Sequence, residues 1–414
     1  MILNIHELSG SLCAIPSKSH LHRLLICAAL SQKESAILCD LPSRDIEATI
    51  ACLKAMGAGI TRTSSRISVS PIQAPPEEAI LPCGESGSSL RFLLPLLGAL
   101  NISGEIRMSG RLPERPMDAY LEALRSHGMA IQKEGVSYYC HGRLTAGEYY
   151  IPGDISSQFL SGLLFSLPLL PGNSTVRLSS PLTSSPYARM TLATLEGAGI
   201  RIHAGEGYYE IPGGQRYHLE GVYSPEGDWS DAAVFLAAGA LSGSVSICGL
   251  NPDSLQGDSA ILDYLSAMGA KISCGDNGIL SERLSFPLHP IRASLADTPD
   301  LAPVLAALAA GAKGTSLFTG CGKLRGKESD RLMALQQLIT DLGGNAEIWE
   351  DSLLIHGTGS LAGGTADCCG DHRIAMAAAL CSLISRQPVQ IDDPDCVAKS
   401  HPGFWEDLSS LRKE

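Results

Sequence analysis

The sequence lacks the features that mark exported, membrane-spanning and nucleic-acid-binding proteins. Its first ten residues, MILNIHELSG, contain no basic start and no apolar stretch, so we expect no signal peptide. No apolar run reaches the roughly 18 residues of a membrane-spanning helix, because proline or glycine interrupts the longest ones. Charged residues make up only 18% of the chain and the net charge is -12, which argues against a nucleic-acid binder with a basic face.

Signals for metal binding are also missing. The 13 cysteines include no CxxC pair, and no HExxH motif occurs among the 11 histidines. We therefore expect no metal site. Scattered cysteines of this kind are typical of free, mostly buried thiols in a reducing compartment, so we expect a cytoplasmic protein.

What the sequence does contain is an internal repeat. A pattern of Leu, three residues, Gly, two residues and Ile occurs at 53–60, 124–131, 195–202 and 265–272, with a weaker copy at 339–348. The glycines of these copies are Gly57, Gly128, Gly199, Gly269 and Gly343, separated by steps of 71, 71, 70 and 74 residues. Each copy predicts a helix that ends at a left-handed glycine and is followed by a strand.

The repeat predicts six units of roughly 70 residues over the 414-residue chain. The last segment, GFWEDLSSLRKE, is typical of a helix, and the first, MILNIHELSG, of a strand that completes the sixth unit. We therefore expect two domains of three units: residues 15–225 form domain one, and residues 1–14 with 226–414 form a discontinuous domain two. A cleft between them is the expected ligand site, and we expect the domains to close on binding.

Cationic segments stand out in this acidic chain. Seven short segments contain Lys or Arg, in most of them together with Ser or Gly, and most precede an apolar helical run: 16–30, 84–100, 109–124, 183–190, 326–335, 371–380 and 395–404. An eighth, GDISSQFLSGLL at 153–164, offers hydroxyls and an amide. Helix N-termini favour anions, and Arg can bind two oxygens of a carboxylate or phosphate. Helix capping explains each segment alone, but seven together predict small ligands with several negative charges.

Several of these segments, in this order, resemble the 5-enolpyruvylshikimate-3-phosphate synthase family of the shikimate pathway. The most specific pieces are SKSHLHR, SSQFL, LRGKESDRL, DHRIAMA and DPDCVAKSHPGF. The resemblance covers nearly the whole chain. It implies an α/β (α+β) fold with two similar domains, each of three βαβαββ units arranged as an inside-out α/β barrel, and an inter-domain cleft.

The resemblance also implies the chemistry. Family members transfer the enolpyruvyl group of phosphoenolpyruvate to the 5-hydroxyl of shikimate 3-phosphate by addition and elimination, without a metal or cofactor, on the route to chorismate and the aromatic amino acids. Two substrates that each carry a phosphate and a carboxylate account for the many cations. We expect a monomer with these small-molecule partners and neither nucleic acid nor membrane.

Motif matching assigns roles to particular residues. The expected catalytic residues are Lys18, Asp300 and Glu328. The expected contacts of shikimate 3-phosphate are Lys18, Ser19, Arg23, Ser156, Ser157, Gln158, Ser184, Tyr187, Asp300 and Lys327. The expected contacts of phosphoenolpyruvate are Lys18, Gly87, Arg115, Gln158, Arg331, Arg373 and Lys399.

Some positions depart from the common family pattern. Many members have Asn-Ala-Gly-Thr where this chain has Glu85-Ser86-Gly87-Ser88, Asn in place of Lys323, and Val in place of Gly326. The acid Glu85 either repels phosphate or pairs with a cation such as Lys18.

Two alternative functions remain open. The first is UDP-N-acetylglucosamine 1-carboxyvinyltransferase, which shares the architecture and the donor but typically has Lys-Asn at the positions of Lys18 and Ser19 and a reactive loop cysteine. The second is a family member that binds ligand without turnover.

Overall fold

The computed structural model describes residues 1–275 and 278–412. They fall into two compact units: unit 1 comprises Met1–Ile15 and Glu226–Glu414, and unit 2 comprises Pro16–Pro225. The chain therefore passes from unit 1 to unit 2 after Ile15 and returns after Pro225. Among the described residues, no helix combines the length and the apolar character needed to cross a bilayer.

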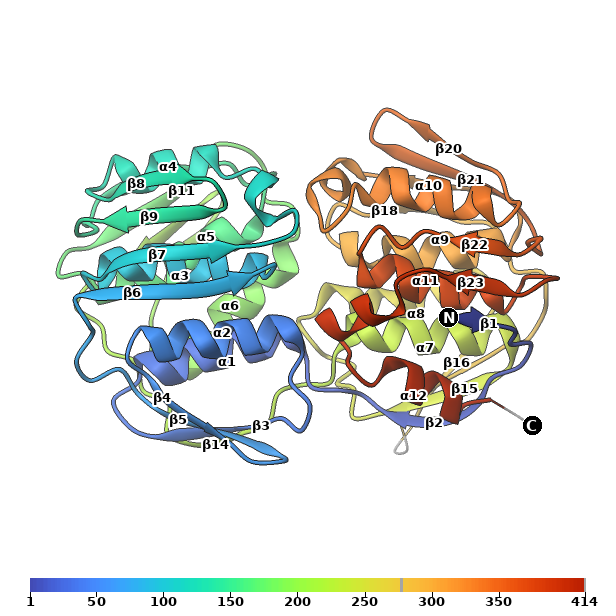
Figure 1. The fold of residues 1–414 in the computed structure, drawn as a ribbon, viewed down its shortest axis with the longest axis horizontal. Coiled ribbons are helices and arrows are strands. Elements are labelled where there is room, and N and C mark those ends of the chain that lie inside the picture. Colours follow the sequence, from blue (N-terminus) through green and yellow to red (C-terminus); the bar gives the residue numbers. More distant parts are fainter. Residues whose placement is uncertain (276–277, 413–414) are drawn as a thin grey trace. The chain divides into compact units, whose positions relative to one another are not determined.

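Unit 2 contains three four-stranded sheets, in the orders β14-β3-β5-β4, β6-β7-β9-β8 and β10-β11-β13-β12 (Figure 1). In each sheet the first pair of strands is parallel and the other two pairs are antiparallel. The strands are β3 Ser35–Leu38, β4 Gly59–Arg62, β5 Arg66–Ser70, β6 Glu78–Gly84, β7 Ser103–Met108, β8 Ala130–Glu134, β9 Ser137–His141, β10 Glu148–Ile151, β11 Ser174–Leu178, β12 His203–Gly205, β13 Tyr208–Ile211 and β14 Gly221–Tyr223.

Two α-helices accompany each sheet of unit 2, which gives the predicted βαβαββ order in the second and third sheets, while the first sheet takes its parallel strand β14 from the end of the unit. They are α1 Lys18–Leu30, α2 Arg44–Ala55, α3 Gly87–Ala99, α4 Asp118–Arg125, α5 Ser157–Ser166 and α6 Ser185–Gly197, with short 3-10 helices η1 Leu112–Glu114 and η2 Leu167–Leu169. Helices α3 and α5 are buried almost throughout, in keeping with their nearly continuous apolar sequences.

Unit 1 repeats this plan in two four-stranded sheets, ordered β16-β17-β15-β2 and β18-β19-β21-β20, and adds a three-stranded sheet ordered β1-β23-β22. Its strands are β1 Ile2–Leu3, β2 Ser9–Cys13, β15 Ser244–Cys248, β16 Lys271–Gly275, β17 Gly278–Glu282, β18 Arg292–Ser294, β19 Lys313–Thr319, β20 Ala346–Trp349, β21 Ser352–Thr358, β22 Gly364–Ala366 and β23 Val389–Ile391. Its helices are α7 Trp229–Ser242, α8 Ile261–Ala267, α9 Ala302–Ala310, α10 Arg331–Asp341, α11 His372–Ser382 and α12 Phe404–Ser410, with η3 Gly257–Ala260, η4 Pro299–Leu301, η5 Gly322–Gly326 and η6 Pro394–Lys399.

The N-terminal segment differs from the single strand predicted for residues 1–10. Only Ile2–Leu3 pairs with β23 and completes the sixth sheet, as predicted. The chain then leaves that sheet, and Ser9–Cys13 pairs with β15 in the fourth. The first 13 residues thus serve two repeats.

The glycines that revealed the repeat all lie in the left-handed region, as predicted. Their φ values are 105° at Gly57, 97° at Gly128, 78° at Gly199, 93° at Gly269 and 81° at Gly343. Each lies two or three residues beyond the last residue of a helix, and a strand follows within four residues. A side chain is disfavoured at such φ values, so glycine ends each helix and turns the chain towards its sheet.

The cysteines are not all free, so that expectation is wrong for one pair. Cys13 and Cys248 lie opposite each other in the parallel strands β2 and β15, with a Cα–Cα distance of 4.7 Å, and form a disulfide. No local pattern indicates this pair, because the two residues are 235 positions apart.

A buried histidine fixes the C-terminal helix of unit 1. His401 Nδ1 lies 2.8 Å from Asp231 Oδ1 on α7, and its Nε2 lies 3.1 Å from Asp407 Oδ2 on α12. Burial lowers the pKa of His401, but the two carboxylates outweigh it and raise this pKa to about 10. The imidazolium therefore joins α12 to the buried helix α7.

Candidate active site

In unit 2, the expected ligand-binding residues gather at helix N-termini. Lys18, Gly87 and Ser157 are the first residues of α1, α3 and α5, and Ser185 begins α6 directly after Ser184. The first turns of α3 and α5 touch, because Gln158 Nε2 donates to Ser88 Oγ at 2.9 Å. Free N–H groups at these ends favour anions.

Gly87, Arg115 and Gln158 lie within a few ångströms of one another. A Cβ atom on Gly87 would lie 3.1 Å from Arg115 Nη1 and 3.7 Å from Gln158 Oε1. It would also lie 2.8 Å from Arg91 Nη1, which donates to Gln158 Oε1 at 2.7 Å. The structure thus joins three expected phosphoenolpyruvate contacts and adds a cation, Arg91, at the same turn.

The guanidinium of Arg23 donates hydrogen bonds to three groups of the protein itself. Its Nη1 donates to the carbonyl of Ser19 at 2.6 Å, and its Nη2 donates to the carbonyl of Tyr187 at 2.9 Å. Its Nε donates to Thr191 Oγ1 at 2.8 Å, and only 2% of the residue is exposed. Burial lowers the pKa of Arg23 to about 10, so it stays charged at neutral pH. Arg23 therefore brings Ser19 and Tyr187 together across α1 and α6.

The remaining expected residues of unit 2 lie at the same helix starts. Lys18 Nζ lies 2.9 Å from Asp45 Oδ2 in the first turn of α2. Ser156 caps α5, since its Oγ accepts from Gln158 N at 3.3 Å. Ser184 has φ 57°, a left-handed conformation that costs a non-glycine residue roughly 1 kcal/mol or more and is typical of functional turns.

In unit 1, the expected residues meet around one buried guanidinium. Arg331 is 1% exposed and contacts three carboxylates. Its Nη1 lies 2.8 Å from Asp300 Oδ1, its Nη2 lies 2.6 Å from Glu328 Oε2, and its Nε lies 2.7 Å from Asp371 Oδ2. Ser329 Oγ donates to the same Asp371 oxygen at 3.0 Å. These contacts bring together the N-terminal ends of α10 and α11 and the 3-10 turn η4 before α9.

Two further cations lie close to the carboxylate of Asp300. Lys327 Nζ lies 3.2 Å and Arg373 Nε 3.6 Å from Asp300 Oδ1. Burial alone would raise the pKa of Asp300, but the charges of these cations, together with that of the buried arginine, outweigh it. The pKa of Asp300 therefore lies well below its ordinary value. Burial lowers the pKa of Lys327, although the aspartate opposes this effect.

Lys399 is the last residue of η6, which packs against α11, the helix whose first turn carries Arg373. It is 5% exposed. Lys399 therefore lies on the element that packs against the helix of Arg373, another expected contact of phosphoenolpyruvate.

Sequence reasoning missed three charged residues of these clusters. Asp45 and Asp371 resemble ordinary carboxylates at helix starts, and Asp371 does cap α11 by accepting from the Arg373 N–H at 3.0 Å. The third, Arg91, lies in the cationic segment 84–100, but motif matching gives it no role. Their proximity to Lys18, Arg331 and Gln158 depends on contacts far apart in the sequence.

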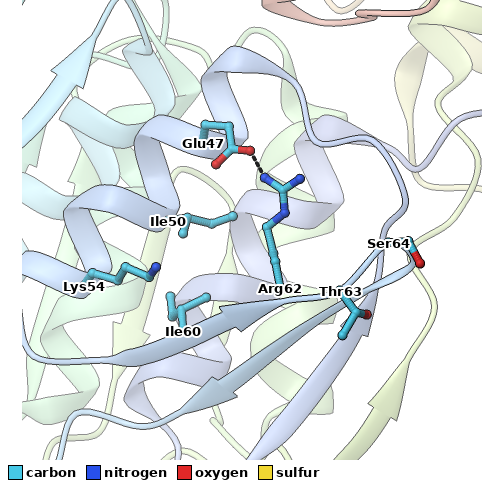
Figure 2. A pocket seen from close by; sticks show the side chains of 7 residues that line it. All are labelled: Glu47, Ile50, Lys54, Ile60, Arg62, Thr63 and Ser64. Carbon is cyan, nitrogen blue, oxygen red and sulfur yellow. Dashed lines mark hydrogen bonds and ion pairs between the residues drawn. The ribbon is translucent and has the colours of Figure 1, made fainter.

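A separate hollow of about 570 Å³ lies on unit 2 between α2 and β4 (Figure 2). Its lining includes Ile50 and Lys54 from the helix, Ile60 from the strand and Thr63 from the turn after it. Glu47 and Arg62 form an ion pair across it. None of the expected site residues lines this hollow, so it is a different place from the helix N-termini described above.

Comparisons with known proteins agree on one family. The family model for EPSP synthase (3-phosphoshikimate 1-carboxyvinyltransferase) matches residues 2–408. The chain is 35% identical to the 3-phosphoshikimate 1-carboxyvinyltransferase of Methanocorpusculum labreanum over 99% of this chain and 98% of that protein. It is 39% identical to the enzyme of that name from Brachyspira hyodysenteriae, over 98% and 97%. A solved EPSP synthase from Acinetobacter baumannii, 24% identical, has the same fold with a TM-score of 0.82 over 99% and 97% of the two chains.

Proposed function

The chain belongs to the EPSP synthase family, and from this premise we propose how its own side chains carry the family's reaction. The enolpyruvyl group of phosphoenolpyruvate is transferred to the 5-hydroxyl of shikimate 3-phosphate, and inorganic phosphate is released. The observation that supports these roles most strongly is the cluster in which Asp300 and Glu328 contact Arg331, with Lys327 beside them.

The first step is an addition. The 5-hydroxyl oxygen attacks C2 of the enol and gives up its proton to a base, while C3 gains a proton from an acid. We assign the base to Asp300, and proton transfer at C3 to Glu328 with help from Lys18. Cations held around the phosphate and carboxylate stabilise the charge that develops on their oxygens.

The second step is an elimination. A proton leaves C3, the C2–O bond to phosphate breaks, and the double bond forms again in the product. The same acid and base serve in reverse, because the proton that C3 gained must now be removed. Fixed cations such as Arg115 and Lys399 hold the departing phosphate.

The low pKa of Asp300 suggests how its basicity is controlled. Three cations contact its carboxylate and make it a weak base. Substrate phosphate and carboxylate groups would compete for Lys327 and Arg373. Losing part of that positive charge raises the pKa of Asp300 and prepares it to accept the hydroxyl proton.

All the residues assigned to this reaction come from one chain, in both of its units. We therefore propose that the enzyme works as a monomer. We also propose that it acts in the cytoplasm, where its two small anionic substrates would be available. Light scattering of the purified chain tests the first statement, since a mass of twice 43.6 kDa would contradict it.

The decisive assay measures phosphate release from phosphoenolpyruvate with two acceptors in parallel. Shikimate 3-phosphate should support turnover, and UDP-N-acetylglucosamine should not. Release with only the sugar nucleotide would make the chain a UDP-N-acetylglucosamine 1-carboxyvinyltransferase. Binding of both family substrates without release would make it a non-catalytic member.

A further inference from the structure

A chain of buried hydroxyl groups connects three helices of unit 2. His22 Nδ1 lies 2.7 Å from Thr49 Oγ1, which lies 2.6 Å from Ser89 Oγ, which lies 2.7 Å from Ser86 Oγ. None of these four residues is more than 1% exposed. We call this chain the hydroxyl relay. It begins on α1, crosses α2 and ends at the cap of α3, directly before Gly87.

The direction of the relay follows from the histidine. Burial is the largest influence and lowers the pKa of His22. Asp45 opposes this effect and the charges of Lys18 and Arg23 add to it, so that the pKa is about 3 and the ring is neutral. Its Nε2 is buried and has no hydrogen-bond partner among the described residues. A buried N–H without an acceptor is rarer than a bare acceptor atom, so the proton belongs on Nδ1. His22 then donates to Thr49, Thr49 to Ser89, and Ser89 to Ser86.

The relay ends on the Ser86 hydroxyl, which accepts two hydrogen bonds. Ser86 Oγ receives the Ser89 hydroxyl at 2.7 Å and the Ser89 backbone N–H at 3.3 Å. Its own proton is therefore directed to neither group. Because Ser86 is the N-cap of α3, the same two bonds fix the turn that carries Gly87.

The relay also lies next to the ion pair of Lys18, a residue assigned to the reaction. Lys18 and His22 are four residues apart on α1, and Asp45 and Thr49 are four apart on α2, so each pair shares a helix face. The Lys18–Asp45 ion pair and the His22–Thr49 hydrogen bond are thus successive links between the same two helices. Ser89 adds α3 to this pair of helices.

We propose that the hydroxyl relay positions the Gly87 turn relative to Lys18, and that Thr49 and Ser89 are positioning residues for the binding of phosphoenolpyruvate. This inference rests on the proposed function. The relay residues are neutral and buried, and they position the turn that binds the ligand. The charged residues of the proposed function contact the ligand itself.

The test is steady-state kinetics of Ser89→Ala and Thr49→Val in the full-length enzyme. Ser89→Ala breaks the relay but leaves the Ser89 N–H to be capped by Ser86, and Thr49→Val removes one hydroxyl with little change of shape. Loss of one relay hydrogen bond should raise the KM for phosphoenolpyruvate about 5- to 10-fold. The kcat and the KM for shikimate 3-phosphate should stay within about twofold of wild type, as expected when only ground-state binding of one substrate is weakened.

Two further variants separate positioning from general stability. Thr49→Ser keeps the hydroxyl and should restore the KM for phosphoenolpyruvate. Thr194→Val removes a buried hydroxyl of α6 that donates to the Met190 carbonyl, and it should lower the melting temperature without changing that KM.

The possible results distinguish a failure of the inference from a failure of the proposed function. If Ser89→Ala and Thr49→Val melt earlier but keep the wild-type KM, or change both KM values and kcat together, the relay has only a structural role and the inference is wrong. If wild-type enzyme releases no phosphate with either acceptor, the proposed function fails and the inference falls with it. A normal wild type with unchanged variants refutes the inference alone.

Discussion

The buried ion cluster around Arg331 makes a strong prediction for Asp371→Asn. Asp371 is fully buried and accepts from Arg331 at 2.7 Å and 3.2 Å, and from Ser329 at 3.0 Å. The amide replaces one accepting oxygen by an NH2 group that faces a donor of the guanidinium. It also removes one of the negative charges that offset the buried cation.

Breaking a buried ion pair by removing one partner costs about 3–5 kcal/mol. Asp300 and Glu328 remain beside Arg331, so we expect the lower end, a loss of about 3 kcal/mol in the free energy of unfolding. For a unit of this size that corresponds to a fall of roughly 6–12 °C in Tm.

Urea unfolding followed by tryptophan fluorescence measures this loss selectively. Trp229, Trp349 and Trp405 are the three tryptophans of the chain, and all lie in unit 1 with Asp371. Asp341→Asn is the matched control, because it neutralises an exposed carboxylate at the end of α10 and should change stability by less than about 0.5 kcal/mol. If Asp371→Asn unfolds within that margin of wild type, the carboxylates do not stabilise the buried arginine.

Three further predictions follow from the charged groups and the cysteines. Glu328→Gln can keep its contact to Arg331 through the amide oxygen, so calorimetry should show near-normal binding of substrates, while kcat should fall about 10²- to 10⁴-fold; normal turnover would remove Glu328 from proton transfer. The pKa of His401 is raised to about 10 in the folded protein, so its ion pairs stabilise fully below pH 6.5 and lose their effect as the pH rises towards 10. The difference in unfolding free energy between wild type and His401→Gln should therefore shrink from pH 6 to pH 10, and a constant difference would contradict the assignment. The double variant Cys13→Ser/Cys248→Ser should have a free energy of unfolding about 2–4 kcal/mol below that of oxidised wild type, and therefore a lower urea midpoint. Excess dithiothreitol should abolish the difference, and equal midpoints without reductant would show that the disulfide is absent in solution.

Much of the fold could be predicted because each repeat carries a local signal. A helix that must turn into a strand needs a left-handed residue, and glycine at Gly57 or Gly269 supplies it at little cost. The use of residues 1–13 was predicted only in part. Pairing of Ser9–Cys13 with β15 joins segments more than 200 positions apart, and no local pattern encodes such a partner.

The candidate site could be predicted only in part. Helix-start motifs located Lys18, Arg331 and Arg373, because short cationic segments before apolar runs are visible in one sequence. Their carboxylate partners were not visible in this way. Asp371 lies 40 positions from Arg331, and only folding makes it a partner rather than an ordinary helix cap.

The hydroxyl relay shows the same limit. Its members are Ser and Thr residues of the kind that helix ends commonly contain, and their hydrogen bonds span 27 and 40 positions. Burial, rather than residue type, distinguishes them from surface hydroxyls.

The proposal that side chains of both units bind the substrates is tested most directly by a crystal structure of the enzyme with shikimate 3-phosphate and an unreactive analogue of phosphoenolpyruvate. Our account predicts that side chains of both units contact the ligand anions, with Lys18 and Arg115 from unit 2 and Lys327 and Arg373 from unit 1. Ligands bound through one unit alone, with the other unit's cations still paired to their own carboxylates, would contradict it.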